Sequence, residues 1–466
     1  MLFTCDGIEE PTLRAKLEKI AKIKSLAMLP LCLPNIHPKR GLESPPQFVA
    51  ATSGTIVPML SAPATNCGMS VFITDLTRED FSPEFLESFA AHLRKGVSDR
   101  VGRTRALSRW LGITKPESGQ YDLTKKELED IFLEGAPAAV RKYGLPENEL
   151  EHIEFGGSTL SQKERQEINL KNLVPLSSYT NGRHEIGYNF GGNHFLEIHA
   201  IEKILDRAYA EKWGLREGQL ALFYHGGGGH ATYHLGRYFA RREKNTPLEK
   251  IALFFLKVAF HFSTWEGIRN FRARWYAYFS HTPFPEIPAS SKEGKRLIQS
   301  IQIGLNYGYA FRVALLKRIN DALPKGTAHF LWDAAHNSIR EEHVGNKSLV
   351  VHRQDAVEII ADRPLMIAGA NNTLSYIGVA GSAPEKTLFS VTPSAGKSIE
   401  RAIAKGISKP EIPRRITLIS KRKKPTLEEK EHITSEGLFD VVREFEKEDI
   451  IKPVAYLRPI GSIKGH

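Results

Sequence analysis

The nine residues Gly191-Gly192-Asn193-His194-Phe195-Leu196-Glu197-Ile198-His199 set the organisation of the chain. Glycine has no Cβ, so the pair at the start lets the backbone come close to a bound group. We predict a helix over 195–213, whose N-terminus would offer free N–H groups to an anion. The Asn, His and Glu side chains at that end suit both a metal ion and a phosphate. The alternative is a glycine turn that starts a buried amphipathic helix.

Histidines end three apolar, strand-like runs later in the chain. The runs Leu220–Tyr224, Phe330–Ala335 and Leu349–Val351 lead into His225, His336 and His352. Strand ends at one rim of a sheet can converge, and histidine is the commonest metal ligand. Together with His194 and Cys67 they predict a metal site assembled from distant positions, because no Cys-x-x-Cys or His-Glu-x-x-His spacing is present. A single histidine of this kind is more often a hydrogen-bonded residue of the core or rim.

Two glycine-containing stretches suggest phosphate binding. In His225-Gly226-Gly227-Gly228-Gly229-His230, four glycines leave backbone N–H groups free to form an anion-binding nest, unless the stretch is only a flexible loop. Gly396-Lys397-Ser398 is similar to the end of a P-loop. Val391 stands where the first glycine of that motif is required, so a Walker A site is excluded.

The composition is that of a soluble globular protein. The chain has 466 residues, of which 41% are hydrophobic and 25% charged, with a formal net charge of +11. The positive charge favours polyanionic partners such as nucleic acid or nucleotides. No secretory signal is visible, and the apolar runs are too short to span a membrane. We therefore expect a cytoplasmic location and no membrane partner.

Strand-like and helix-like segments alternate irregularly, and the spacing of parallel βαβ units is not sustained. This favours an α+β fold over a doubly wound sheet. We expect one large domain over 1–466, with mixed sheets and flanking helices. Residues 81–171 are mostly helical and charged, which predicts a helical insertion within that domain.

The stretch Ile268–Phe279 interleaves arginines with aromatic residues. Arg269 and Arg272 stand among aromatic side chains, a mixture that suits stacking on bases and pairing with phosphates. We predict that both arginines bind RNA. The same pattern is equally typical of an amphipathic helix whose aromatic side chains pack into the core.

Several short blocks, taken in order, resemble the family of RtcB-type RNA ligases, and the resemblance covers nearly the whole chain from Pro34 onward. The blocks are Pro34-Asn35-Ile36-His37-Pro38, Asn66-Cys67-Gly68-Met69, Gly191–Ile198, the His225 glycine loop, Asn306-Tyr307-Gly308-Tyr309-Ala310, Ala335-His336-Asn337, Val351-His352-Arg353, Ser375-Tyr376, Ala395-Gly396 and Ile463-Lys464-Gly465.

The resemblance implies an enzyme that joins RNA ends bearing a 2′,3′-cyclic phosphate or 3′-phosphate to 5′-hydroxyl ends, in tRNA splicing or RNA repair. Such enzymes use GTP and manganese, and a histidine carries GMP covalently to the RNA 3′-phosphate. By position, the metal ligands would be Cys67, His194, His225 and His336, and the guanylate contacts would be Asn193, Glu197, Ser375 and Lys464. Lys464 would also stabilise developing charge. Zinc is the alternative metal, because thiolates favour it. The implied partners are RNA, GTP and an archease-like activator.

Four positions depart from the family pattern. Ala64 stands where an aspartate normally binds a second metal, and Asn35 replaces an acidic residue. Pro393 occupies the place of the guanylylated histidine. Lys397 replaces an arginine and cannot make the same bidentate phosphate contact. Lysine is a nucleophile when its pKa is lowered, so Lys397 is a speculative substitute.

Two functions therefore remain open at this point. One is a divergent RNA ligase that still handles GTP and RNA ends. The other is a non-catalytic member of the family that binds one metal ion and RNA ends.

Overall fold

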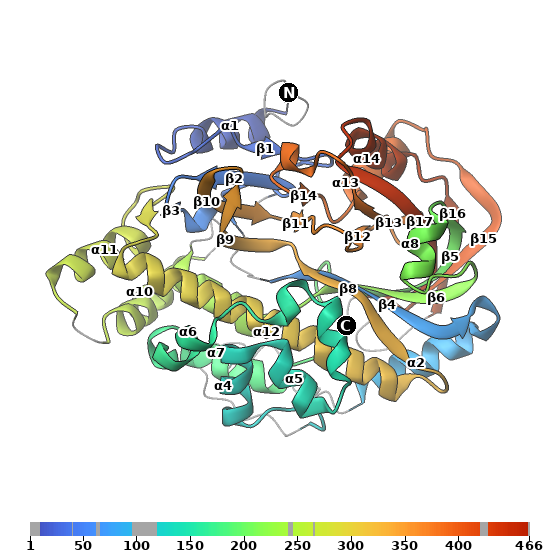
Figure 1. Ribbon diagram of the computed structural model, residues 1–466, viewed down its shortest axis with the longest axis horizontal. Coiled ribbons are helices and arrows are strands. Elements are labelled where there is room, and N and C mark those ends of the chain that lie inside the picture. The colour runs from blue at the N-terminus through green and yellow to red at the C-terminus, as the bar shows by residue number, and fades with distance from the viewer. Residues whose placement is uncertain are drawn as a thin grey trace.

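The computed structural model describes residues 10–39, 41–61, 66–95, 119–240, 246–263, 266–419 and 427–464. Helices and mixed sheets form an α+β fold, as predicted (Figure 1). The strands are β1 (Leu31–Cys32), β2 (Phe48–Thr52), β3 (Thr55–Ile56), β4 (Gly68–Thr77), β5 (Phe195–Ile204), β6 (Gln219–Gly226), β7 (Ile287–Pro288), β8 (Ala328–Ala335), β9 (Asn337–Val344), β10 (Lys347–Gln354), β11 (Val357–Glu358), β12 (Leu365–Ile367), β13 (Ser375–Ala380), β14 (Ser390–Val391), β15 (Pro410–Ile419), β16 (Leu427–Ile433) and β17 (Ile451–Lys464).

The α-helices occupy the segments between these strands. They are α1 (Pro11–Ile20), α2 (Pro83–Arg94), α4 (Lys125–Glu134), α5 (Ala136–Tyr143), α6 (Gln162–Glu167), α7 (Leu176–His184), α8 (Arg207–Lys212), α9 (Gly229–Phe239), α10 (Pro247–His261), α11 (Ile268–Tyr278), α12 (Lys292–Ala322), α13 (Gly396–Ala404) and α14 (Glu436–Lys447). Within the described part of the chain, no helix combines the length and apolarity that a membrane crossing requires.

The largest sheet has the order β12-β13-β17-β5-β6-β4-β8, and β15 and β16 extend it from β17. Neighbouring strands along this path pair antiparallel, so chain reversals place alternate strand starts and strand ends at the same rim. A second sheet, β1-β2-β10-β9, lies nearby. Two further sheets have two strands each, β3-β7 and β11-β14.

The helix predicted over 195–213 is wrong. Residues Phe195–Ile204 form β5, and only Arg207–Lys212 are helical, as α8. Alternate side chains of β5 enter the cores on opposite faces of the sheet, with Leu196 and Ile198 in one cluster and Ile201 in the other. A strand buried on both faces reads as a continuous apolar run, which periodicity cannot distinguish from a buried helix.

The 31-residue helix α12 runs under the large sheet and organises one of its faces. It is buried along most of its length and packs against α2, α4, α5 and α9. In Figure 1, α4, α5 and α12 lie below the strands. A second core covers the other face, with contributions from α13 and α14. The central strands of the sheet are thus covered by apolar cores on both sides, whereas β15 and β16 expose most of their residues.

The described part of 81–171 packs into the core beneath the sheet. Leu86 of α2, Phe132 of α4 and Val140 of α5 belong to the same apolar cluster as α12. Glu154 is buried there and accepts a hydrogen bond from the backbone N–H of Ala335 at 3.0 Å. The segment therefore supports the end of β8, and its status as an insertion remains a prediction.

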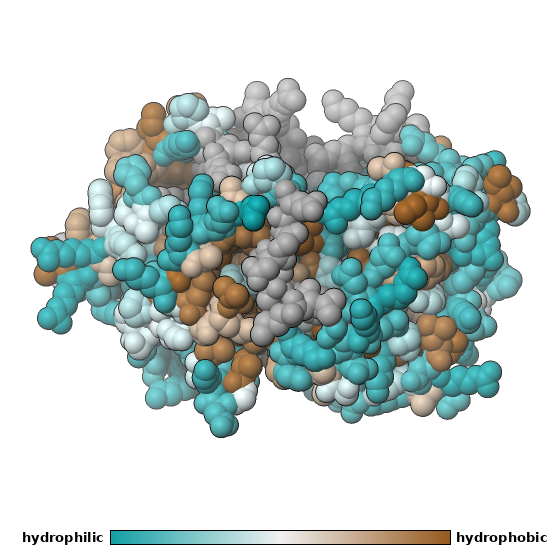
Figure 2. Space-filling view, turned by 90° about the horizontal axis from the view of Figure 1, so that it is seen from above, coloured by the Kyte–Doolittle hydropathy of each residue, from teal (hydrophilic) through white to brown (hydrophobic). Residues whose placement is uncertain are grey.

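The two helices α10 and α11 lie at one end of the molecule, at the left of Figure 1. Seen from above, the molecular surface is mostly hydrophilic, and hydrophobic residues are gathered in separate patches (Figure 2). This distribution is ordinary for a globular protein, in which single apolar residues are commonly exposed.

Candidate metal centre

Four neighbouring strands bring the predicted metal ligands to one rim of the large sheet. Phe195 pairs with His225 across β5 and β6, and Gly68 on β4 pairs with both Gly226 and Ala335. The start of β4 and the start of β5 thus lie beside the end of β6 and the end of β8. Cys67, His194 and His336 flank these strands by one residue, which explains how positions far apart in sequence meet.

The side chains of this rim form a compact cluster. Cys67 Sγ lies 3.4 Å from His194 Nε2 and 3.6 Å from His225 Nε2, and the two Nε2 atoms of His225 and His336 are 3.0 Å apart. Donor atoms of Cys67, His225 and His336 all lie within 4.8 Å of one another, and all three residues are buried. Tetrahedral ligands at metal distances of about 2.0–2.3 Å would be roughly 3.3–3.6 Å apart. The group of Cys67, His225 and His336 therefore fits one metal ion. His194 lies beside Cys67, and its role as a fourth ligand remains a prediction.

A hydrogen bond on His225 and an ion-pair contact on His336 orient the two buried imidazoles toward the cluster. The Nδ1 of His225 lies 3.0 Å from the backbone oxygen of Asn193, and the Nδ1 of His336 lies 3.0 Å from Oδ1 of Asp355. An Nδ1–H that donates to an oxygen leaves Nε2 with its lone pair free for a metal. Both rings thus present the ligating nitrogen to Cys67.

The electrostatics of the cluster favour a thiolate. Burial alone raises the pKa of Cys67, but His225, His194 and His336 outweigh it and hold the pKa well below its ordinary value. For His336, burial lowers the pKa, whereas the Cys67 thiolate and the Asp355 carboxylate raise it to about 10. The thiolate is the ligating form of cysteine, and metal binding would release the proton of His336.

Asp355 is a functional residue that sequence reasoning missed. Its carboxylate accepts a hydrogen bond from Gln47, and its backbone N–H donates to Oδ1 of Asn337 at 2.9 Å. Its φ of 53° lies in the left-handed region, where aspartate is tolerated better than most residues. The sequence signal for Asp355 is its position three residues after His352, just beyond the strand-like run. A pattern of histidines at strand ends does not include it.

Helix α12 supports the turn that carries Cys67. The guanidinium of Arg312 pairs with Asp333 and donates to the side-chain oxygen of Asn66 at 3.0 Å, and Arg312 and Asp333 are fully buried. A Cβ on Gly308 would collide with the side chain of Asn66, so only glycine lets α12 approach this closely. The block around Gly308 is therefore a support for the site and supplies none of its donors.

The glycine loop after His225 leaves few residues free to form an anion-binding nest. Gly226 still belongs to β6, and α9 begins at Gly229 with Gly228 in the left-handed conformation. The backbone N–H of Ala231, in the first turn of α9, donates to Glu185 at 2.7 Å. A carboxylate thus already occupies part of the N-terminus that was predicted to bind an anion.

His352 does not join the cluster. It lies inside β10, where its Nε2 accepts a hydrogen bond from the backbone N–H of Val57 at 3.0 Å and its Nδ1 lies 3.1 Å from the oxygen of Val350. These partners require a neutral ring. Burial lowers the pKa of His352 to about 4, so the residue is a core histidine.

This pKa predicts a loss of stability in acid. The unfolded chain takes up a proton at His352 near pH 6.5 and the folded chain only near pH 4, so the contribution is complete above pH 6.5 and declines below it. Between pH 7 and pH 5 the loss amounts to roughly 2 kcal/mol. Urea unfolding of His352→Gln should show lower stability at pH 7 and a smaller decline toward pH 5. An unchanged decline would contradict this role.

The sequence matches known proteins over most of its length. A family model described as "tRNA-splicing ligase RtcB" matches residues 16–465. The chain belongs to the RtcB family. Proteins named tRNA-splicing ligase RtcB include one from Methanopyrus kandleri, 26% identical over 452 residues that cover 86% of this chain and 41% of the relative. Another, from Archaeoglobus fulgidus, is 26% identical over 481 residues, covering 96% of this chain and 89% of the relative.

The chain spans only part of some of these relatives. The RtcB protein of Pyrococcus furiosus is 26% identical over 434 residues, which cover 86% of this chain and 40% of the relative. About two fifths of the length is likewise covered in the Methanopyrus kandleri protein.

The residues that the RtcB resemblance assigns to the nucleotide differ in their exposure. Asn193 is exposed in the turn before β5, and Lys464, at the end of β17, pairs with Phe195. Glu197 is buried and lies 3.1 Å from His199 Nε2. Ser375 is buried too, and its hydroxyl accepts a hydrogen bond from the N–H of Gly369 at 3.0 Å. Asn193 and Lys464 are thus open to a ligand, whereas Glu197 and Ser375 already have protein partners.

The segment that the resemblance aligns with the guanylylated histidine is a turn in which Pro393 is buried. Pro393 accepts a hydrogen bond at its backbone oxygen from Ala368 at 2.8 Å. Asn35 fixes the turn by donating to the oxygen of Ser394 at 2.9 Å and accepting from the N–H of Ser398 at 2.8 Å. The departure at Asn35 therefore has a structural role. Ala64, the other departure, lies outside the described residues.

Lys397 is held by an ion pair at the surface. Its ammonium group contacts the carboxylate of Glu400, one turn along α13, and its side chain is 44% exposed. The nucleophile role of Lys397 remains a prediction.

Arg269 and Arg272 are both exposed on α11, as RNA contacts require. The aromatic residues Phe271, Trp275 and Tyr276, with Arg272 and Ser280, line a shallow surface pocket. Arg274 differs, because it is buried and pairs with Glu266 and Glu293. The interleaved pattern thus has an outer part suited to a base and a phosphate, and an inner part that holds the helix in place.

Proposed function

We propose that this RtcB family member joins RNA ends, with GTP and a bound metal ion, by coupling a 2′,3′-cyclic phosphate or 3′-phosphate to a 5′-hydroxyl. The observation that carries the proposal is the buried cluster of Cys67, His225 and His336, with His194 beside it. Polarisation of a phosphoryl oxygen is the chemistry that manganese or zinc supplies in such a site. The thiolate favours zinc, and the resemblance to RtcB enzymes favours manganese.

The residues around the cluster would bind and orient the reacting phosphate. Asn193 is exposed in the turn before β5, and its backbone oxygen lies beside Nδ1 of His225. Its side-chain amide would therefore contact a phosphate or a guanylate near the cluster. Lys464 supplies a cation at the neighbouring strand end, where it would stabilise developing negative charge. Glu197 and Ser375 would contact the guanylate only by giving up their present hydrogen bonds.

The central test is covalent attachment of GMP. The chain is incubated with labelled GTP and manganese and analysed on a denaturing gel, and any adduct is mapped by mass spectrometry. We expect no acid-labile phosphoramidate of the histidine type at position 393, because proline offers no nucleophile there. An adduct on Lys397 that Lys397→Arg abolishes would support a displaced nucleophile. An adduct on a histidine would show that Pro393 is wrongly aligned with the RtcB histidine.

The same assay gives a gain-of-function test. Pro393→His alone should not restore ligation, because Ala64 leaves a second metal without its usual carboxylate. Pro393→His combined with Ala64→Asp has the better chance, since both groups act on the same phosphate in RtcB enzymes. Ligation by Pro393→His alone would contradict the need for the second carboxylate.

A second candidate function is recognition of RNA ends without catalysis. It is favoured by Pro393, which lacks a nucleophile, and by Lys397, which is already paired with Glu400. Under this function the metal cluster would bind the terminal phosphate, and no GMP adduct would form on any residue. An archease-like activator would be required by the ligase alone, so adding one distinguishes the two functions.

RNA binding is expected to depend on α11. Charge reversal by Arg269→Glu or Arg272→Glu should weaken binding of single-stranded RNA and reduce the salt dependence of log K by about 0.7–1 per arginine. Arg443→Glu, on the exposed face of α14, serves as the control, because Figure 1 places α14 far from α11. Equal effects of all three variants would indicate a general charge effect and contradict a specific contact at α11.

A further inference from the structure

The helices α10 and α11 bury polar residues and expose apolar ones. On α10 the buried stripe consists of Leu253, Lys257 and His261, whereas Phe254 and Phe255 are 44% and 66% exposed. Burying a lysine costs free energy unless it is paired, and the ammonium group of Lys257 donates to the backbone oxygen of Ala240 at 3.3 Å. An outward apolar face on a helix of this kind marks an interaction surface.

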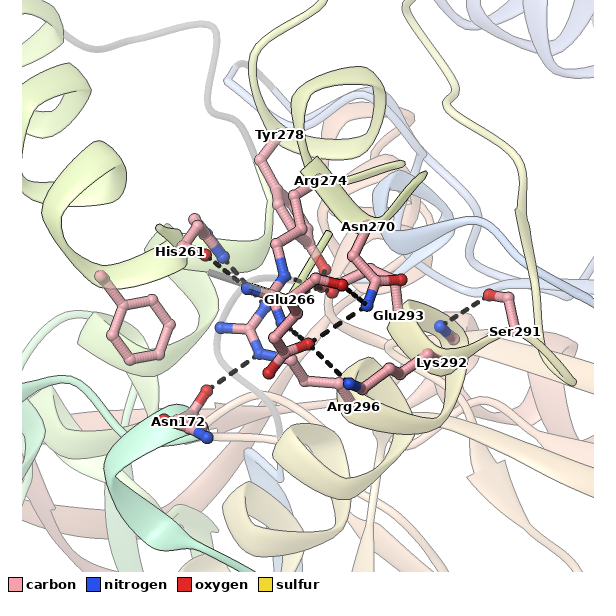
Figure 3. Close-up of polar contacts among 12 residues, drawn as sticks. Asn172, His261, Glu266, Asn270, Arg274, Tyr278, Ser291, Lys292, Glu293 and Arg296 are labelled. Carbon is pink, nitrogen blue, oxygen red and sulfur yellow. Dashed lines mark hydrogen bonds and ion pairs between the residues drawn. The ribbon is translucent and has the colours of Figure 1, made fainter. Parts of the chain in front are cut away.

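A buried polar network fixes this pair of helices to the body of the protein (Figure 3). Glu293 of α12 accepts hydrogen bonds from Arg274, Arg296 and Tyr278 at 2.8, 2.7 and 2.6 Å. Arg274 also donates to the backbone oxygen of His261 at 2.7 Å, at the end of α10. The outward face of α10 is therefore held as a rigid surface above α12.

The outward residues of α10 follow a heptad pattern. Leu248, Ile251, Phe255, Val258 and Phe262 recur at alternating steps of three and four residues, which aligns them along one side of the helix. The last of them, Phe262, caps the end of α10, and its ring already packs against Phe271 and Phe279. Leu248 and Ile251 are 77% and 58% exposed, and the seam lies opposite the buried stripe. A seam with this spacing is the surface that packs against another helix in a coiled coil.

The seam is large enough for association of two chains. With Phe254, which lies beside the seam on the same outward face, Leu248, Ile251 and Phe255 expose roughly 500 Å², taking about 200 Å² for each fully exposed large side chain. Burying this surface on two subunits removes roughly 1,000 Å² from water, the lower limit for a specific interface. The expected dimer is therefore reversible and of modest affinity.

The seam carries no charged side chain, which favours another apolar helix over an RNA backbone as its partner. The five heptad residues are apolar and Lys257 points inward, so α10 offers an RNA backbone no cations along this line. Two copies of such a seam meet without like-charge repulsion, and Ala252 and Ala259 provide room for larger side chains. We propose that a second copy of this chain docks here, with the two α10 helices antiparallel and Phe255 at the two-fold axis. In this arrangement Ile251 faces Ala259 of the partner subunit.

The first test measures mass in solution. Sedimentation equilibrium of the full chain should show a monomer–dimer equilibrium in the micromolar range. Ile251→Glu should raise the dissociation constant by roughly 100-fold, because a carboxylate would be buried in an apolar seam. Ile403→Glu is the matched control, since Ile403 is 50% exposed on α13 and lies outside the seam. A monomer at all concentrations, or equal effects of both variants, would overturn the proposal.

The second test fixes the orientation. Ile251→Glu combined with Ala259→Lys should restore the dimer, because each new carboxylate then faces a new ammonium group across the two-fold axis. Within one helix these positions are eight residues, or about 12 Å, apart and cannot pair. Failure of the double variant to restore association would overturn the antiparallel arrangement. A loss of RNA affinity in Ile251→Glu without any change in mass would assign the seam to RNA, and a loss of monomer stability would assign it to this chain's own residues; either result overturns the proposal.

Discussion

Cys67→Ala should abolish stable metal retention by the purified chain. Cys67 supplies the thiolate that contacts both His194 and His225, so its removal leaves only imidazoles to hold the ion. Asp355→Asn should have a graded effect, a loss of metal affinity of about 10–100-fold, because Asp355 orients His336 without ligating. Metal content measured by elemental analysis after gel filtration, with zinc and with manganese, checks both expectations.

His343→Ala is the control for these variants. His343 is exposed on β9 and lies outside the cluster, so its removal should leave metal content unchanged. If Cys67→Ala and His343→Ala retained equal amounts of metal, the cluster would not be the metal site. The same samples also test the order of affinities, since a thiolate site should retain zinc more firmly than manganese.

Asp333→Ala should destabilise the protein by roughly 3–5 kcal/mol, the usual cost of leaving a buried charge without its partner. Asp333 pairs with Arg312 beneath the Cys67 turn, and both side chains are fully buried. The uncompensated guanidinium would also disturb Asn66, so metal retention should fall with stability. Chemical unfolding followed by tryptophan fluorescence, with metal content measured in parallel, checks this result.

A double-mutant cycle separates the charge from the packing. Replacing both partners, by Arg312→Met with Asp333→Leu, should cost less than Asp333→Leu alone, because no charge then remains buried. Additive losses in the two single variants and the double variant would show that the pair is not coupled.

The strand ends were predictable because their physics is local. An apolar run that ends in histidine predicts a strand and places the histidine at the edge of the sheet where that strand ends. For His225 and His336 this prediction is correct, and the two side chains lie together. The same rule failed for His352, since whether a strand ends at a histidine or continues past it depends on pairing with β2 and β9. Neighbouring strands, which lie far away in sequence, decide that point.

Other features required the folded chain. β5 reads as a helix because it is buried on both faces, and only its pairing with β6 and β17 resolves the ambiguity. Asp355 gains its role solely through contact with His336. On α11, the arginine pattern alone could not show that Arg274 turns inward to Glu293 while Arg272 stays outside. In each case the sequence is compatible with two structures, and tertiary contacts determine which of them forms.

The pairing of Gly68 with Ala335 joins positions separated by more than half of the chain. Contacts of such separation form slowly, because a long loop must close before they contribute. The metal-ligand atoms on either side of this pairing can meet only after the loop has closed. A metal bound by them would therefore join the two ends of the loop late in folding. Interactions formed late lower the rate of unfolding more than they raise the rate of folding. The metal would then govern how long each folded molecule survives in the presence of proteases and chelators, a lifetime that denaturation kinetics with and without a chelator would measure directly.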